Sequence, residues 1–190
     1  MCAARPYGGW QMRTGIEPAE ERVLSVLAGA PPVVVAISRQ VTRLGDRTSV
    51  WIAAASAGLL RSVRSRRAGP VAVAVTTLAA GAAVRAGLAV SLNRRRPPER
   101  LWHMEWSGPS FPSRHTTLAT LGAGLVAGCL AADDPRAARA ITWGTAGAVG
   151  VSRLVLGVHW PTDVLGGWLF AAGLLLASHR LRAAAGAASR

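Results

Sequence analysis

The stretch VAVAVTTLAAGAAVRAGLAVSL, residues 71–92, is long and apolar enough to cross a lipid bilayer as a single helix. It contains one charged residue, Arg85. An arginine at membrane depth is either functional or snorkels to the interface, and both interpretations fit this position equally well. No segment of the chain alternates apolar and polar residues for long, as a half-buried strand would. We therefore predict an all-α, integral-membrane protein.

Other apolar runs lie on both sides of this stretch. Residues 48–60, 116–132, 137–158 and 163–178 are candidate helices, although the first run is short for a full crossing. Residues 33–44 carry several polar side chains, which favours an amphipathic helix at the membrane surface. Small residues such as Gly122 and Gly144 would let neighbouring membrane helices pack closely. Together these runs predict a bundle of five or six membrane helices.

The organisation along the chain follows from the same runs. We predict a flexible or interfacial segment at residues 1–20, a single membrane domain at residues 21–182, and a cytoplasmic tail at residues 183–190. No apolar run precedes Val23, so we expect no cleavable signal peptide.

The composition limits the classes of function. The chain has 190 residues, 51% of them hydrophobic, and a net charge of +13. A soluble domain spreads its charges over its surface, whereas here they are clustered between apolar runs. A basic chain suits nucleic acid, anionic lipid or a phosphorylated substrate, and the lipid-soluble segments make nucleic acid the weakest of these partners. Two cysteines, Cys2 and Cys129, predict neither a disulfide framework nor a metal site.

The arginines also indicate an orientation. The loop 61–67, Arg136 and the Arg180–Arg182 region fall on one side of the membrane if the apolar runs alternate in direction. The positive-inside rule makes that side cytoplasmic. The polar connection at residues 93–114 and the turn at His159 then face outward. Three tryptophans of this outer side are expected in an aromatic belt at the membrane interface: Trp102, Trp106 and Trp160.

Three polar segments meet on that outer side, NRRRP at 93–97, FPSRH at 111–115 and residues 152–163. A planar guanidinium binds phosphate oxygens in pairs and stays charged. Ser113 and His115 stand where a loop enters an apolar helix, and the N–H groups and dipole of a helix start favour an anion. Asp163 follows one helical turn after His159, so its carboxylate can bond one imidazole nitrogen and leave the other free to attack.

These segments resemble the three motifs of the type-2 phosphatidic acid phosphatase superfamily, in the family's order and over roughly residues 71–179. Residues 152–163, SRLVLGVHWPTD, are similar to the third motif without departure. Residues 112–115, PSRH, resemble the second motif, Pro-Ser-Gly-His, with arginine in place of glycine. Arg96-Pro97 resembles the end of the first motif, whose opening lysine falls at Ala89 in this chain.

The resemblance implies a mechanism for these residues. His159 would attack phosphorus and form a phosphohistidine, Asp163 would orient it, and His115 would protonate the leaving group and then activate water. The phosphate oxygens would be held by Arg96, Ser113, Arg114 and Arg153, with Arg85 as the candidate replacement for the lysine missing at Ala89. The family needs no metal, and the resemblance implies no cofactor.

The substrate that the resemblance implies is a lipid phosphate in the bilayer. Small bacterial members commonly act on isoprenoid phosphates or diphosphates, so the first expectation is an undecaprenyl diphosphate or a decaprenyl-linked phosphate. Phosphatidic acid and phosphatidylglycerol phosphate are the alternatives. Vanadate-dependent haloperoxidases share the same constellation but are soluble, which the apolar runs argue against. A lipid-phosphate-binding protein that has lost catalysis stays open because of Ala89, and the sequence leaves the oligomeric state open as well.

Overall fold

The computed structural model describes residues 11–188, and within that range all regular structure is helical, which confirms the all-α prediction. The α-helices and the two 3₁₀ turns (η) are, in chain order, α1 Glu17–Ala28, α2 Pro32–Val41, η1 Thr42–Gly45, α3 Arg47–Ser65, α4 Gly69–Leu92, η2 Glu99–Leu101, α5 Arg114–Leu130, α6 Pro135–Val155 and α7 Pro161–Ala188. Predictions for residues 1–10 and 189–190 lie outside the described part of the chain.

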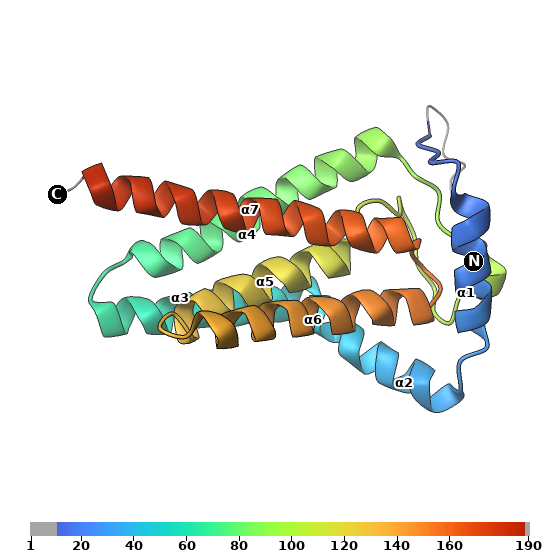
Figure 1. Cartoon of the computed structure of the whole chain (residues 1–190), viewed down its shortest axis with the longest axis horizontal. Helices are drawn as coiled ribbons and strands as arrows, with labels where there is room; N and C mark the ends of the chain where they lie inside the picture. The colour runs from blue at the N-terminus through green and yellow to red at the C-terminus, as the bar shows by residue number, and fades with distance from the viewer. Residues whose placement is uncertain (1–10, 189–190) are drawn as a thin grey trace.

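Helix α5 is the centre of the bundle and contacts α3, α4, α6 and α7 (Figure 1). Its residues Leu118, Leu121 and Leu125 are buried against Val50 of α3 and Leu78 of α4. The predicted close packing at glycine occurs in this core, because a Cβ at Gly122 would lie 2.6 Å from Val50 Cγ1. A Cβ at Gly144 would meet nothing within 4 Å, so that glycine has no such role in the bundle.

Local sequence explains where several helices begin and end. The Pro31-Pro32 pair separates α1 from α2, because a proline lacks the N–H of a continuing helix, and the two parts are bent by 112°. Asp134 caps α6 through its side chain, with Pro135 as the first helical residue. Ser113 caps α5 in the same way, which places this hydroxyl at the helix start that the sequence predicts.

Two of the described helices are long and apolar enough to cross a membrane, Gly69–Leu92 and Pro161–Leu181, and a third crossing exists if the bent pair α1–α2 is one broken span. The count of five or six membrane helices therefore stays a prediction. Large apolar side chains point outward along the bundle, among them Val90 at 76% and Leu169 at 65% exposure. Such exposure suits contact with lipid and not with water.

One end of the bundle differs from the rest. Helix α1 lies across the end at which α4 finishes and α5 and α7 begin, while the remaining helices run roughly along the long axis (Figure 1). The three polar segments singled out in the sequence lie at this end. They are the connection that follows α4, the start of α5 and the turn that leads into α7.

Candidate active site

The three polar segments come together as predicted, held by backbone hydrogen bonds between them. The amide of Ser113 donates to the carbonyl of Asp163 at 3.0 Å, which joins the second segment to the third. The amide of Ser110, the residue before the second segment, donates to the carbonyl of Arg94 in the first segment at 2.9 Å. The helix starts of α5 and α7 are thus fixed against the connection that follows α4.

His159 lies in the turn between α6 and α7 and is fully buried. Its Nε2 is 3.2 Å from Nη1 of Arg96, and its Nδ1 is 3.4 Å from Oδ2 of Asp163. A guanidinium can only donate, so Nε2 is the accepting nitrogen and the ring proton sits on Nδ1, facing the carboxylate. Burial first, and then the charge of Arg96, hold the pKa of His159 well below its ordinary 6.5. The ring is therefore neutral at physiological pH, with the lone pair of Nε2 facing Arg96.

Asp163 is held by a buried network that the sequence did not predict. Its Oδ2 accepts from the amide of Trp160 at 2.9 Å, and its Oδ1 is 2.6 Å from Nη1 of Arg94. The other end of Arg94 pairs with Glu20 of α1 at 2.7 Å, and Glu20 also accepts from the amide of Thr162 at 2.7 Å. Arg94, which the sequence left unassigned, and Glu20, which it placed outside the site, thus fix the carboxylate that faces His159.

His115 stands at the start of α5 and is 1% exposed. Its Nε2 is 2.9 Å from Oδ1 of Asp46, the residue that precedes α3. Its Nδ1 is buried and has no hydrogen-bond partner among the described residues. Asp46 lies far away in the sequence and belongs to none of the three segments, so motif reasoning did not find it.

Two further predicted residues carry buried, unsatisfied donors. Arg153 is fully buried and donates from Nη1 to the hydroxyl of Thr42 at 2.9 Å. Its Nε and Nη2, together with Nε of Arg114, have no partner within the part of the chain that the structure describes. Buried donors of a cation are costly to leave unpaired, so this cluster is suited to receive an anion.

Trp106 covers the same cluster. Its ring lies 4.8 Å from Cζ of Arg153, 5.1 Å from that of Arg114 and 5.7 Å from that of Arg96. It also meets the ring of His115 edge-on, with centroids 5.0 Å apart. The sequence placed Trp106 in an interfacial belt; the structure brings its indole against the guanidinium groups, where cation–π attraction holds it.

The remaining predicted residues have more local contacts. Ser113 is fully buried, and its hydroxyl accepts from that of Thr116 at 3.0 Å. Arg85 donates from Nε and Nη2 to the carbonyl of Pro112, at 2.9 and 2.8 Å, so its described contacts hold the backbone of the second motif. Ala89, at the position of the family's lysine, is buried at 4% exposure.

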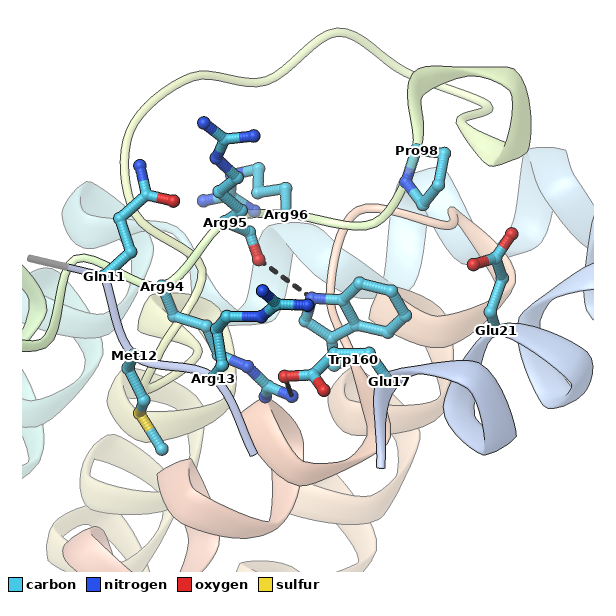
Figure 2. Close-up of a pocket in the computed structure, with 10 residues that line it drawn as sticks. All are labelled: Gln11, Met12, Arg13, Glu17, Glu21, Arg94, Arg95, Arg96, Pro98 and Trp160. Atoms are coloured by element: carbon cyan, nitrogen blue, oxygen red, sulfur yellow. Dashed lines mark hydrogen bonds and ion pairs between the residues drawn. The ribbon is translucent and has the colours of Figure 1, made fainter. Parts of the chain in front are cut away.

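A cavity of about 550 Å³ lies beside the site (Figure 2). Trp160 and Arg96 line it from the side of the motifs, and Arg13, Glu17 and Glu21 line it from the N-terminal segment and α1. No cluster of His, Cys, Asp or Glu that could hold a metal occurs among residues 11–188. Charged side chains thus share the lining with Met12, Pro98 and Trp160, while His159 and His115 do not line this cavity.

Comparison with known proteins identifies the family. The family model of the PAP2 superfamily matches residues 69–187. The chain belongs to the PAP2 superfamily. It is 34% identical over 146 residues to the decaprenylphosphoryl-5-phosphoribose phosphatase of Mycolicibacterium smegmatis. The aligned residues cover 76% of this chain and 77% of that protein. Membership of the PAP2 superfamily, together with this relative, makes the chain a phosphatase.

A solved structure agrees with the fold of this PAP2 protein. The transmembrane PAP2-type phosphatidylglycerolphosphate phosphatase of Bacillus subtilis superposes with a TM-score of 0.80, over 90% of this chain and 87% of the other, at 21% identity. This likeness shows the fold and suggests a membrane location. The family match begins at residue 69, so Glu20, Thr42 and Asp46 all lie ahead of it.

Proposed function

We propose that this PAP2 protein hydrolyses the phosphate of an isoprenoid lipid through a phosphohistidine on His159, without a metal. The observation that carries the mechanism is the pair of contacts on the His159 ring. Asp163 faces Nδ1, and a guanidinium faces the unprotonated Nε2. Such a ring is both oriented and neutral, as a nucleophile must be.

The first step joins Nε2 of His159 to phosphorus. The bond from phosphorus to the leaving oxygen breaks, and that oxygen takes a proton from His115. In the second step His115 takes a proton from water, the water oxygen bonds to phosphorus, and the P–Nε2 bond breaks to release phosphate. His115 is suited to both transfers because its Nδ1 is buried and unpartnered among the described residues.

The arginines would hold the equatorial oxygens of the phosphoryl group. Arg153 and Arg114 offer unpaired donors, while Arg96 already contacts the attacking nitrogen. Charge stabilisation of this kind supplies much of the rate in phosphoryl transfer. Ser113 contributes through the helix start that it caps, and Arg85 acts through the Pro112 backbone, in place of a direct contact from a lysine at Ala89.

The substrate we favour is a phosphate carried on a polyprenyl-linked lipid, for example a decaprenyl-linked sugar phosphate. The named relative with 34% identity supports this choice. The cavity beside the first motif, which Arg96 lines, is large enough to take a sugar. Phosphatidylglycerol phosphate is the second candidate, since the structural neighbour carries that activity in its name. We place the site on the outer side of a multi-pass membrane protein, on the arginine count of the loops.

The test is phosphate release by the detergent-purified protein in EDTA, from a decaprenyl-linked sugar phosphate, a polyprenyl diphosphate, phosphatidylglycerol phosphate and phosphatidic acid. We expect release that His159→Ala abolishes and that His179→Ala, a histidine far along α7, leaves intact. Acid-labile phosphate on the protein, absent from His159→Ala, would identify the intermediate. Lack of release from every lipid would refute the proposal and favour a binding protein.

A further inference from the structure

The segment Thr42–Asp46 lies outside the family match, yet it touches two residues of the site. Asp46 presents Oδ1 to Nε2 of His115 at 2.9 Å, and Thr42 accepts from Nη1 of Arg153 at 2.9 Å. Gly45 brings the backbone close, because a Cβ there would lie 2.6 Å from the carbonyl oxygen of His115. The contact between Asp46 and His115 is thus built by close backbone packing as well as by the hydrogen bond.

We propose that Asp46 is a positioning residue for His115 and forms a second His–Asp pair beside His159–Asp163. This inference rests on the phosphohistidine mechanism proposed above. A carboxylate can only accept, so Asp46 places a proton on Nε2 of His115. The unpartnered Nδ1 is then the nitrogen that exchanges a proton with the leaving oxygen and with water.

The charges around His115 explain why a carboxylate is needed. To act as an acid, the ring must carry a second proton, on Nδ1. Burial of the ring opposes this protonation first, followed by the positive charges of Arg153 and Arg114, which lie against the same tryptophan ring that His115 meets edge-on. Asp46 is the negative group in direct contact with the ring, and it stabilises the imidazolium as the carboxylate of a catalytic triad does.

The inference predicts a dependence on the leaving group. A lipid alkoxide or sugar alkoxide must be protonated as its bond to phosphorus breaks, whereas p-nitrophenolate leaves without a proton. Impaired proton transfer by His115 therefore slows the first step for the lipid but spares it for p-nitrophenyl phosphate. The second step needs His115 as a base with either substrate, so phosphoenzyme accumulates when the aryl ester is used.

The experiment compares Asp46→Asn and Asp46→Ala with wild type on both substrates, in stopped flow and at steady state. General acid–base catalysis contributes about 10²- to 10⁴-fold, so we expect Asp46→Asn to slow lipid turnover by at least about 10-fold and Asp46→Ala by more. With p-nitrophenyl phosphate, Asp46→Asn should keep a burst of one nitrophenolate per enzyme at the wild-type rate, followed by a slow phase. Asp133→Asn, an exposed aspartate in the α5–α6 connection, is the matched control and should resemble wild type.

The outcomes separate the two proposals. If Asp46→Asn turns over lipid at the wild-type rate, or if its lipid rate and its aryl burst fall together, Asp46 has no positioning role. Wild-type protein that forms no phosphohistidine would overturn the proposed function and this inference with it. A melting temperature close to that of wild type keeps Asp46→Asn interpretable, and the aryl burst itself reports that the nucleophile and the phosphate site are intact.

Discussion

Glu20→Gln and Glu21→Gln make the same chemical change at neighbouring positions of α1, in opposite environments. Glu20 is 5% exposed and pairs with the buried guanidinium of Arg94 at 2.7 Å. Glu21 pairs with Arg100, and these side chains are 33% and 65% exposed. If the buried network around Asp163 stabilises the fold as its geometry indicates, only the first substitution should be strongly destabilising.

The magnitude follows from burial. Removing one partner of a buried ion pair costs about 3–5 kcal/mol, because the remaining charge is left uncompensated. Arg94 keeps its contact with Asp163 at 2.6 Å, and the side-chain carbonyl oxygen of the glutamine can still accept from the amide of Thr162. The lower end of that range therefore applies to Glu20→Gln. An exposed pair contributes about 0–1 kcal/mol, which sets the expectation for Glu21→Gln.

The assay is thermal unfolding in detergent, followed by tryptophan fluorescence. At about 2–4 °C per kcal/mol for a chain of this size, Glu20→Gln should lower Tm by at least about 6 °C. Glu21→Gln should lower it by no more than about 4 °C on the same scale. Glu20→Gln should also slow turnover, since Arg94 orients Asp163. Equal shifts in Tm for the two variants would refute the reasoning, because the buried pair would then contribute no more than the exposed one.

Three other outcomes are expected. Gly157→Ala should lower the free energy of unfolding by about 1–2 kcal/mol because the residue has a φ of +71°. The loss should be larger still because a Cβ there would lie 1.9 Å from the carbonyl oxygen of Leu101, and turnover should be slower because this turn carries His159. Gly144→Ala is its control, and similar losses in both, by Tm and turnover, would contradict this. The pKa of His159 is lowered in the folded protein, so below pH 6.5 the unfolded chain binds a proton at this residue and the folded chain does not. The free energy of unfolding therefore decreases by about 1.4 kcal/mol for each unit by which the pH is lowered. Between pH 7.5 and pH 5.5, the Tm of His159→Gln should therefore decrease by less than the Tm of wild type. An equal decrease in both proteins would show that His159 does not contribute. Trp106→Ala should bind orthovanadate about 10-fold more tightly in inhibition assays, because cation–π contacts worth about 1–2 kcal/mol no longer compete with the anion; unchanged inhibition would place the anion elsewhere.

The part of the site that the sequence predicted is the part encoded locally. His159 and Asp163 are one turn apart at a helix start, so their contact at 3.4 Å follows from chain geometry. Ser113 and His115 likewise follow from the start of an apolar helix, and Ser113 is the cap of α5. Helix boundaries were predictable for the same reason, since α4 ends at Leu92 as its apolar run does.

The part that the sequence did not predict is made of long-range contacts between single residues. Asp46 meets His115 and Glu20 meets Arg94 across long stretches of chain, and a lone carboxylate carries no pattern that names its partner. A weak signal was present for Arg94, since a cation within a predicted phosphate segment must be neutralised or must bind an anion. The contacts of Trp106 with the guanidinium groups were not predicted for a related reason, because an aromatic residue near a helix end suits an interface belt and a cation–π contact equally well.

The helices ahead of residue 69 contribute side chains to the site as well as apolar surface to the bundle. The region matched by the family model, residues 69–187, contains all three motifs and the arginines that surround them. Two carboxylates from outside it join Asp163 in compensating this positive charge: Glu20 pairs with Arg94, and Asp46 acts on Arg114 and Arg153 while it contacts His115. A phosphate site without substrate must hold several buried guanidinium groups close together, and their repulsion has to be offset while the site is empty. Helix α1 supplies negative charge at Arg94, and the turn before α3 supplies it at His115, so the segment ahead of the matched region stabilises the site while no phosphate is bound.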